Sequence, residues 1–188
     1  MAFTHLHVHT EYSLLDGSNK IKEYVRRVKE LGMDSAAITD HGVMYGVIDF
    51  YKACRAEGIR PILGCEVYVA PNSRFDKELT GGDDRYYHLV LLAENNTGYN
   101  NLTRIVSRGF TEGYYYKPRV DMELLQEFHE GIIALSACLA GEVQRYITKG
   151  LYDEAKKTAL KYQACFGKGN YFLELQDHGL PEQKIVNT

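Results

Sequence analysis

The sequence lacks the features that mark several classes of protein. No apolar run approaches the roughly 18 residues needed to span a membrane, and no basic segment followed by an apolar run indicates a signal peptide. The net charge is −3 over 188 residues, so no excess of basic side chains indicates a dedicated nucleic-acid-binding surface. We expect a cytoplasmic domain, or part of a larger one, with no membrane partner.

Cysteine is scarce, and its spacing excludes a disulfide framework. The chain has no CxxC pair, and its four cysteines are Cys54, Cys65, Cys138 and Cys165. In a chain of this size, such wide spacing is typical of reduced cytoplasmic thiols. Hydrophobic residues make up 45% of the sequence, which is enough for a sizeable core.

Strand-like and helix-like segments alternate along the chain. Helices are predicted around 20–31, 44–51, 102–110, 152–166 and after Pro181. Strands are predicted at 3–9, 34–42, 60–70, 86–93, 131–139 and 171–178. The polar segments 71–85 and 112–119 are predicted as loops, the first as a hairpin tip. Repeated β–α units favour parallel strands, and about six strands predict an α/β fold resembling an incomplete TIM-like barrel.

Three of the seven histidines alternate near the start of the chain, in HLHVHTEYSLLDG (5–17). In a strand, His5, His7 and His9 would share one face. Side chains two residues apart lie roughly 6.6 Å apart at their roots, so two imidazoles can converge on one metal ion. Side chains four apart are about 13 Å apart. A neighbouring pair is therefore a plausible ligand set, and all three on one ion are not.

Other polar side chains follow or interrupt the predicted strands. In barrels of this type, functional residues gather at the carboxyl ends of the strands. That rule selects His7, His9, Asp16, Asp40, His41, Glu66, Ser136, Cys138, Asp177 and His178. Taken singly, most of these residues have an ordinary structural role. Glu66 is different, because an unpaired carboxylate inside an apolar strand needs a cation or several hydrogen-bond donors.

His88 begins its predicted strand instead of ending it. If 71–85 is a hairpin tip, the returning strand brings His88 back beside Glu66. Imidazole and thiolate ligands suit zinc, whereas carboxylates also suit manganese or iron. These residues exceed the needs of one tetrahedral site, so we predict two or three divalent ions bridged by Glu66. Such clusters activate water and neutralise charge on a phosphoryl group.

Seven motifs occur in order from Phe3 to the last residue: HLHVHTEYSLLDG, ITDHG, GCEVYV, YYHLVLLAENNTGYNNL, EGYYYKPR, LSACLAG and QDHGLPEQ. Together they resemble the PHP (polymerase and histidinol phosphatase) domain at the amino terminus of bacterial DNA polymerase III alpha subunits. The resemblance implies a distorted, seven-stranded TIM-like (β/α) barrel with three metal ions. It implies the ligands His7, His9, Asp16, His41, Glu66, His88 and Cys138.

The resemblance also implies that residues 1–188 are the N-terminal part of this domain. A further Asp-x-His ligand pair and the polymerase domains would then lie beyond residue 188. Asp177 and His178 are adjacent, so they do not replace that pair. With the barrel incomplete, we expect weak metal retention, low intrinsic activity and a tendency to associate.

The main functional hypothesis is metal-dependent 3′–5′ exonuclease activity within a replicative DNA-directed DNA polymerase. Its partners would be the 3′ end of the primer strand, the rest of the polymerase chain and other replisome subunits. The family resemblance assigns His7, His9 and Glu66 to one ion. It assigns Glu66, His88 and Cys138 to a second and Asp16 and His41 to a third. His9 and Glu66 would be catalytic.

The segment EGYYYKPR (112–119) is a candidate for binding the substrate. Lys117 and Arg119 would contact its phosphates, while Tyr114–Tyr116 stack on unpaired bases. The alternative is a solvated loop with packed tyrosines.

Two other functions remain open from the sequence. The domain could be a non-catalytic platform that braces a polymerase or docks a proofreading subunit. It could also be a stand-alone histidinol-phosphatase-like phosphoesterase, although NNTGYNNL and HGLPEQ argue against that reading.

Overall fold

The structure is a computed structural model that describes residues 3–78 and 85–188, and its fold is mixed α/β. The helices are α1 (Ile21–Glu30), α2 (Val47–Glu57), α3 (Asn96–Thr111), α4 (Met122–Glu127), α5 (Glu142–Thr148), α6 (Tyr152–Phe166) and α7 (Pro181–Val186). The strands are β1 (Ser35–Ile38), β2 (Arg60–Val69), β3 (Tyr87–Ala93), β4 (Tyr114–Tyr115), β5 (Lys117–Val120), β6 (Ile132–Leu135) and β7 (Tyr171–Phe172).

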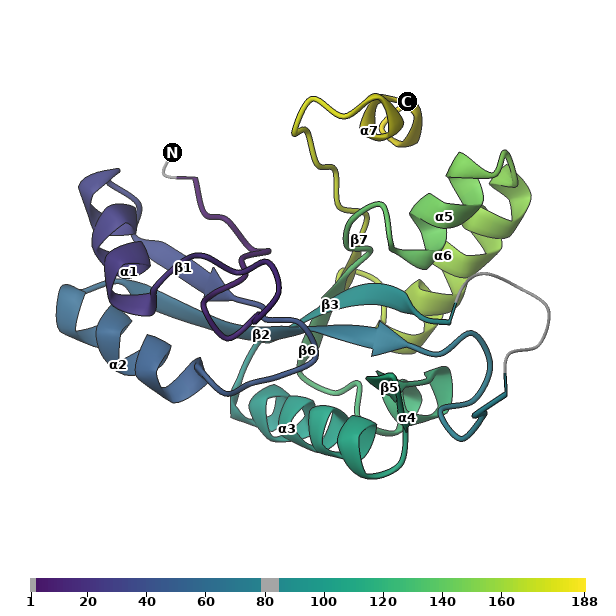
Figure 1. Ribbon diagram of the computed structural model, residues 1–188, viewed down its shortest axis with the longest axis horizontal. Helices are drawn as coiled ribbons and strands as arrows, with labels where there is room; N and C mark the ends of the chain where they lie inside the picture. Colours follow the sequence, from purple (N-terminus) through teal and green to yellow (C-terminus); the bar gives the residue numbers. More distant parts are fainter. Residues whose placement is uncertain (1–2, 79–84) are drawn as a thin grey trace.

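Within the described residues these seven strands form one sheet in the order β4-β5-β2-β3-β6-β7, with β1 also paired to β2. The α/β class is confirmed, but the sheet stays open and does not close into a barrel (Figure 1). The expectation of parallel strands is wrong at β3, which runs antiparallel to both β2 and β6. Antiparallel neighbours need no crossover helix, and the described part of the connection from β2 to β3 contains none.

Several predicted elements differ from the structure. Residues 3–9 are extended but form no regular strand. Their main attachment is at Val8, where the Thr39 amide donates to the Val8 carbonyl at 2.8 Å. The predicted loop 112–119 contains the small hairpin of β4 and β5. The last predicted strand, 171–178, is reduced to the two residues of β7. The tip of the predicted 71–85 hairpin, residues 79–84, lies outside the described part of the chain.

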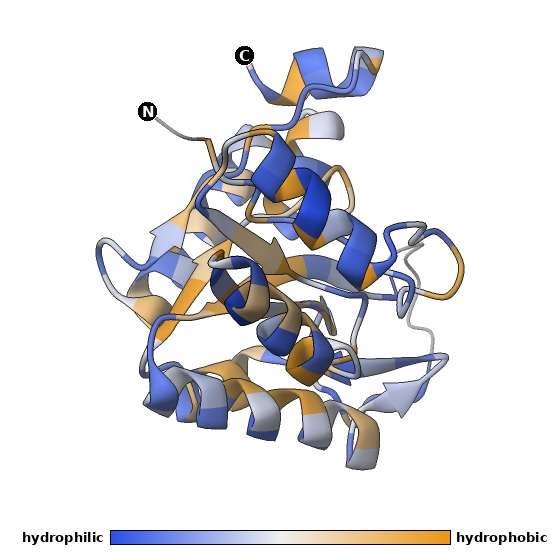
Figure 2. Cartoon of the chain, turned by 90° about the vertical axis from the view of Figure 1, so that its left-hand side faces the viewer, coloured by the Kyte–Doolittle hydropathy of each residue, from blue (hydrophilic) through white to orange (hydrophobic). Residues whose placement is uncertain are grey.

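The two faces of the central strands have different surroundings. Cys65, Val67, Leu89 and Leu91 alternate along β2 and β3 and pack in the main core with α3, α4 and α6. The opposite face of β3 and β6 carries a smaller apolar cluster of Val90, Leu92, Leu135 and Ala137. In Figure 2 the strands are mostly hydrophobic, whereas the helices alternate hydrophilic and hydrophobic residues along their length. The second face is therefore available for a functional site.

Helices α1 and α2 build a separate core beside β1. Val25, Phe50 and Ile38 are among its fully buried members. Asp121 caps the start of α4, because its side chain accepts a hydrogen bond from the Leu124 amide at 3.0 Å. No helix in the described residues is both long enough and apolar enough to cross a bilayer.

Candidate metal centre

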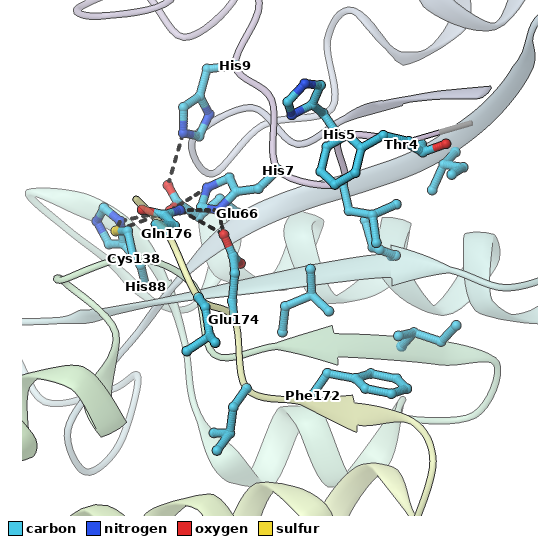
Figure 3. A pocket seen from close by; sticks show the side chains of 18 of the residues that line it. Thr4, His5, His7, His9, Glu66, His88, Cys138, Phe172, Glu174 and Gln176 are labelled. Carbon is cyan, nitrogen blue, oxygen red and sulfur yellow. Dashed lines mark hydrogen bonds and ion pairs between the residues drawn. The ribbon is translucent and has the colours of Figure 1, made fainter. Parts of the chain in front are cut away.

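The N-terminal segment, residues 3–9, places two imidazoles on the face of the sheet opposite the main core. The ring centroids of His7 and His9 lie 5.1 Å apart, and both rings approach Glu66. His5 instead is exposed and packs edge-on against Phe3. Figure 3 shows the His5 ring pointing away from Glu66. Two of these histidines, and not three, therefore lie beside Glu66, although the segment is not a regular strand; their sharing of one metal ion stays a prediction.

Glu66 is the centre of the cluster. It lies within β2 and is 1% exposed. Its Oε1 atom is 3.0 Å from His7 Nε2 and 3.0 Å from His88 Nδ1. Its Oε2 atom is 3.8 Å from His9 Nε2 and also contacts His41 Nδ1. One buried carboxylate therefore faces four imidazoles that come from three separate segments of the chain.

The pairing of β2 with β3 explains how His88 arrives. Tyr68 lies opposite His88 in the antiparallel ladder, which places that imidazole beside Glu66 as the hairpin hypothesis expects. Cys138 follows β6, and its Sγ atom is 3.6 Å from His88 Nδ1 and 3.9 Å from Glu66 Oε1. Ala137 has a φ of 63°. Such left-handed backbone at a non-glycine residue is costly and is often found at functional sites.

A tight turn places Asp16 against His41. Asp16 Oδ2 lies 2.9 Å from His41 Nε2, and the Asp16 side chain is 58% exposed. Gly17 is required in this turn, because a Cβ atom there would lie 1.8 Å from the Thr10 carbonyl oxygen. The buried Asp40 has a structural role, since it accepts hydrogen bonds from the Thr10 amide at 2.6 Å and the Ser13 hydroxyl at 2.8 Å.

The donor set suits divalent cations. His7 Nε2, His9 Nδ1, His41 Nδ1 and Glu66 Oε2 are buried. Two of these nitrogens lie close to Glu66 oxygens, but none of the four atoms makes a hydrogen bond of normal geometry among the described residues. Ring nitrogens without protons and carboxylate oxygens all present lone pairs, so their convergence requires protons or cations between them. Two groups have ligand atoms within 4.8 Å of one another: His7, His9 and Glu66, and His41, Glu66 and His88. These residues therefore fit metal ions of the zinc, manganese or iron type.

The buried carboxylate and the imidazoles around it shift one another's pKa values. Burial alone would raise the pKa of Glu66, but the surrounding imidazoles of His41, His7 and His88 outweigh it and hold that pKa well below its usual range. Burial would lower the pKa of His7, but the carboxylates of Glu174 and Glu66 raise it to about 9. Burial lowers the pKa of His9. The site thus favours a charged carboxylate and needs positive charge beside it.

The cysteines remain free thiols in the structure, as their spacing predicts. Cys54, Cys65 and Cys165 are buried, whereas Cys138 is partly accessible at the cluster. Burial raises the pKa of the Cys138 thiol to about 11. A nearby cation would favour the thiolate.

Glu174 joins this cluster and was missed from the sequence. Its Oε1 atom lies 2.8 Å from His7 Nδ1, and Gln176 Nε2 donates to the same oxygen at 2.7 Å. Figure 3 shows the Glu174 side chain below Glu66, with its carboxylate directed toward His7 and Gln176. The signal was present, because Glu174 lies between Leu173 and Leu175 much as Glu66 lies between two apolar residues.

The remaining candidates near the end of the chain make local contacts. Asp177 accepts from the Gly179 amide at 3.1 Å, and the His178 amide donates to Gln183 at 2.7 Å. The Ser136 hydroxyl is buried and accepts from Gln144 at 2.7 Å.

The two candidate phosphate-binding residues have different surroundings. Arg119 is 4% exposed and donates to the carbonyls of Gly113 at 3.3 Å and Arg74 at 3.4 Å. Its guanidinium is therefore engaged with backbone. Lys117 Nζ lies 5.4 Å from the centre of the Tyr68 ring, which in turn lies 5.3 Å from the His88 ring. Of the two candidate phosphate-binding residues, Lys117 is therefore the one that lies near the histidine–glutamate cluster.

A cleft of about 1230 Å³ opens beside the cluster. His7, His41 and Glu66 line one part, and Ile62 and Leu92 contribute an apolar floor. The cleft also extends along the chain segment that follows β7. It gives an extended ligand access to the buried carboxylate.

Comparisons with known proteins identify relatives of the whole chain. The PHP domain family matches residues 5–178. DNA polymerase III subunit alpha from Treponema pallidum is 54% identical over 99% of this chain, and that from Deinococcus radiodurans is 50% identical over 98%. The subunit from Helicobacter pylori is 48% identical over 99%. The chain spans 14–16% of the length of these relatives.

Two solved structures align with most of the chain at low identity. An amidohydrolase from Chromobacterium violaceum aligns with a TM-score of 0.49 and 15% identity, covering 90% of this chain and 87% of that one. A protein from Bifidobacterium adolescentis described as a metal-dependent phosphoesterase gives 0.45 and 12%, covering 98% and 82%. These scores are too low to support an argument about function.

Proposed function

The chain belongs to the PHP domain family and matches the N-terminal region of DNA polymerase III alpha subunits, and from that premise we propose that its histidine–glutamate cluster is a divalent-metal centre for phosphodiester hydrolysis. The proposed reaction is removal of nucleotides from a DNA 3′ end. One observation carries the proposal: the buried Glu66 carboxylate faces four imidazoles, and several of the lone pairs there have no partner in the described residues.

Two or three ions would be held by the residues predicted from the sequence: His7, His9, Asp16, His41, Glu66, His88 and Cys138. His7, His9 and Glu66 would form one group, and His41, Glu66 and His88 another. Asp16 would support metal binding through its contact with His41. Cys138 would support it from its position beside His88. Such ions, when bound, would activate water and neutralise charge on the phosphoryl group.

The side chains of the chain itself would align the substrate. Glu66 would bridge the two ligand groups, because its two oxygens face different imidazoles. Lys117 would approach a substrate phosphate across Tyr68. Tyr116 is 62% exposed, although its ring already packs against Arg85 at 4.6 Å and against Tyr115 at 4.7 Å, so a base would stack on its open side. Arg119 is not included, since backbone carbonyls already occupy its donors.

The wider assignment follows from the relatives. We propose that the chain acts as part of a replicative DNA polymerase III alpha subunit, with DNA, the rest of that polymerase and other replisome subunits as partners. The 3′–5′ exonuclease activity would then serve proofreading.

The test compares the purified protein with Glu66→Gln and His9→Ala, assayed with zinc or manganese on single-stranded DNA labelled at its 5′ end. Each variant is expected to shorten the strand from its 3′ end about 100-fold more slowly, comparable to the loss of one group that stabilises a transition state. Glu94→Gln is the control, because Glu94 lines the same cleft but is absent from both ligand groups. Equal, very low rates in wild type and variants would overturn the nuclease proposal and favour a structural platform.

A further inference from the structure

We propose that Glu174 is a positioning residue for the metal centre: it fixes the tautomer and ring orientation of His7. This inference rests on the proposed metal centre and adds a residue outside its ligand groups. The carboxylate of Glu174 would act through His7, not by touching the reacting atoms.

The hydrogen-bond chemistry assigns the tautomer. Glu174 Oε1 lies 2.8 Å from His7 Nδ1, and an ionised carboxylate can only accept a hydrogen bond. Gln176 Nε2 also lies 3.2 Å from this Nδ1 atom, but it donates to Glu174 Oε1 over the shorter distance of 2.7 Å. Because the contact of Nδ1 with the carboxylate oxygen is the shorter of its two, the Nδ1 atom carries the proton. In the neutral ring this leaves the lone pair on Nε2, the atom that lies 3.0 Å from Glu66 Oε1. A histidine that donates its other N–H to a carboxylate is the usual arrangement behind a metal-binding imidazole.

Glu174 is itself held in place from the end of β6. Its backbone amide donates to the Ser136 hydroxyl at 2.8 Å, and Gln144 donates to that same hydroxyl at 2.7 Å. Gln176 donates to Glu174 Oε1 at 2.7 Å. These contacts restrict the carboxylate before any ion binds, so the His7 ring is preorganised.

Within the described residues, no other side-chain hydrogen bond of Glu174 accounts for this partly buried charge. The Glu174 side chain is 14% exposed, and its Oε2 atom has no hydrogen-bond partner among the described residues. Its hydrogen-bonded contacts through Oε1 are to His7 and Gln176. The position of Glu174 is therefore accounted for by its effect on His7.

The experiment measures zinc affinity by competition with a chromophoric chelator for wild type, Glu174→Ala, Glu174→Gln and Glu94→Gln. Glu174→Ala is expected to weaken zinc binding about 10–100-fold, the usual loss when such a supporting carboxylate is removed. Glu174→Gln should fall between Glu174→Ala and wild type, because its amide oxygen can still accept from His7 Nδ1. Glu94→Gln changes the same charge in the same cleft and should bind zinc like wild type.

A spectroscopic readout separates positioning from a general effect on folding. Nitrogen-15 NMR of the zinc-loaded wild type should show His7 protonated at Nδ1, with this state partly restored in Glu174→Gln and lost in Glu174→Ala. Zinc affinity of Glu174→Ala within twofold of wild type, or equal losses in Glu174→Ala and Glu94→Gln, would overturn the inference. Failure of wild type to bind zinc at all would instead overturn the proposed metal centre beneath it.

Discussion

Glu66 and Glu174 occupy similar sequence surroundings, with an apolar residue on each side. A buried carboxylate costs several kcal/mol unless donors or cations compensate it, so both positions carry information about their surroundings. The sequence identified Glu66 because an unpaired carboxylate inside a predicted apolar strand needs a cation or several hydrogen-bond donors. Glu174 was overlooked in favour of the neighbouring Asp177 and His178, whose contacts are local.

Arg74 is a second residue whose importance depends on burial. It is 3% exposed, its Nη1 atom lies 2.8 Å from Asp121 Oδ1, and its Nε atom lies 2.6 Å from Glu112. Arg74→Met would leave Asp121 as a buried, uncompensated charge, so we expect the free energy of unfolding to fall by about 3–5 kcal/mol. Urea denaturation measures this change.

The matched control is Arg27→Met, which breaks an exposed pair with Glu30. That variant should lose less than about 1 kcal/mol, because solvent screens the pair. Similar losses in the two variants would show that the Arg74 network contributes no more than a surface pair.

At the level of elements, the start of α3 depends on a close approach between two backbones. A Cβ atom at Gly98 would lie 1.8 Å from the carbonyl oxygen of Gly131, so Gly98→Ala must displace backbone. We expect the free energy of unfolding to fall by about 1–3 kcal/mol, the usual cost of overpacking, measured by urea denaturation.

Gly109 on the same helix provides the control. Its added Cβ would come no closer than 3.4 Å to Val120, and alanine favours a helix interior over glycine by about 1 kcal/mol. Gly109→Ala should therefore be neutral or stabilising. A loss at Gly109 as large as that at Gly98 would contradict this account of α3.

For the whole molecule, the proposed ligands come from the N-terminal segment, the β1–β3 region and the turn after β6. The unfolded chain cannot hold these segments together, so metal binding should favour the folded state. Zinc at 100 times its dissociation constant is expected to raise the free energy of unfolding by about 2.7 kcal/mol. Urea denaturation with zinc and with chelator measures the difference.

The same titration on Glu66→Gln should show a much smaller effect of zinc. Identical unfolding curves for wild type with and without zinc would argue against a metal site formed by folding.

Local sequence pattern was sufficient for several of the elements and for part of the site. Helical spacing predicted α1 and α6, alternation predicted that His7 and His9 point the same way, and apolar neighbours marked Glu66 as exceptional. These features depend on residues a few positions apart, where backbone geometry relates sequence spacing directly to direction in space.

Tertiary structure alone decided which elements became neighbours. It left the sheet open, set β3 antiparallel to β6 and buried Arg119 against carbonyl groups. It also brought Glu174 to His7 across 167 positions of sequence. Such contacts depend on how whole elements pack and on the burial that results, and no periodicity within one element contains that information.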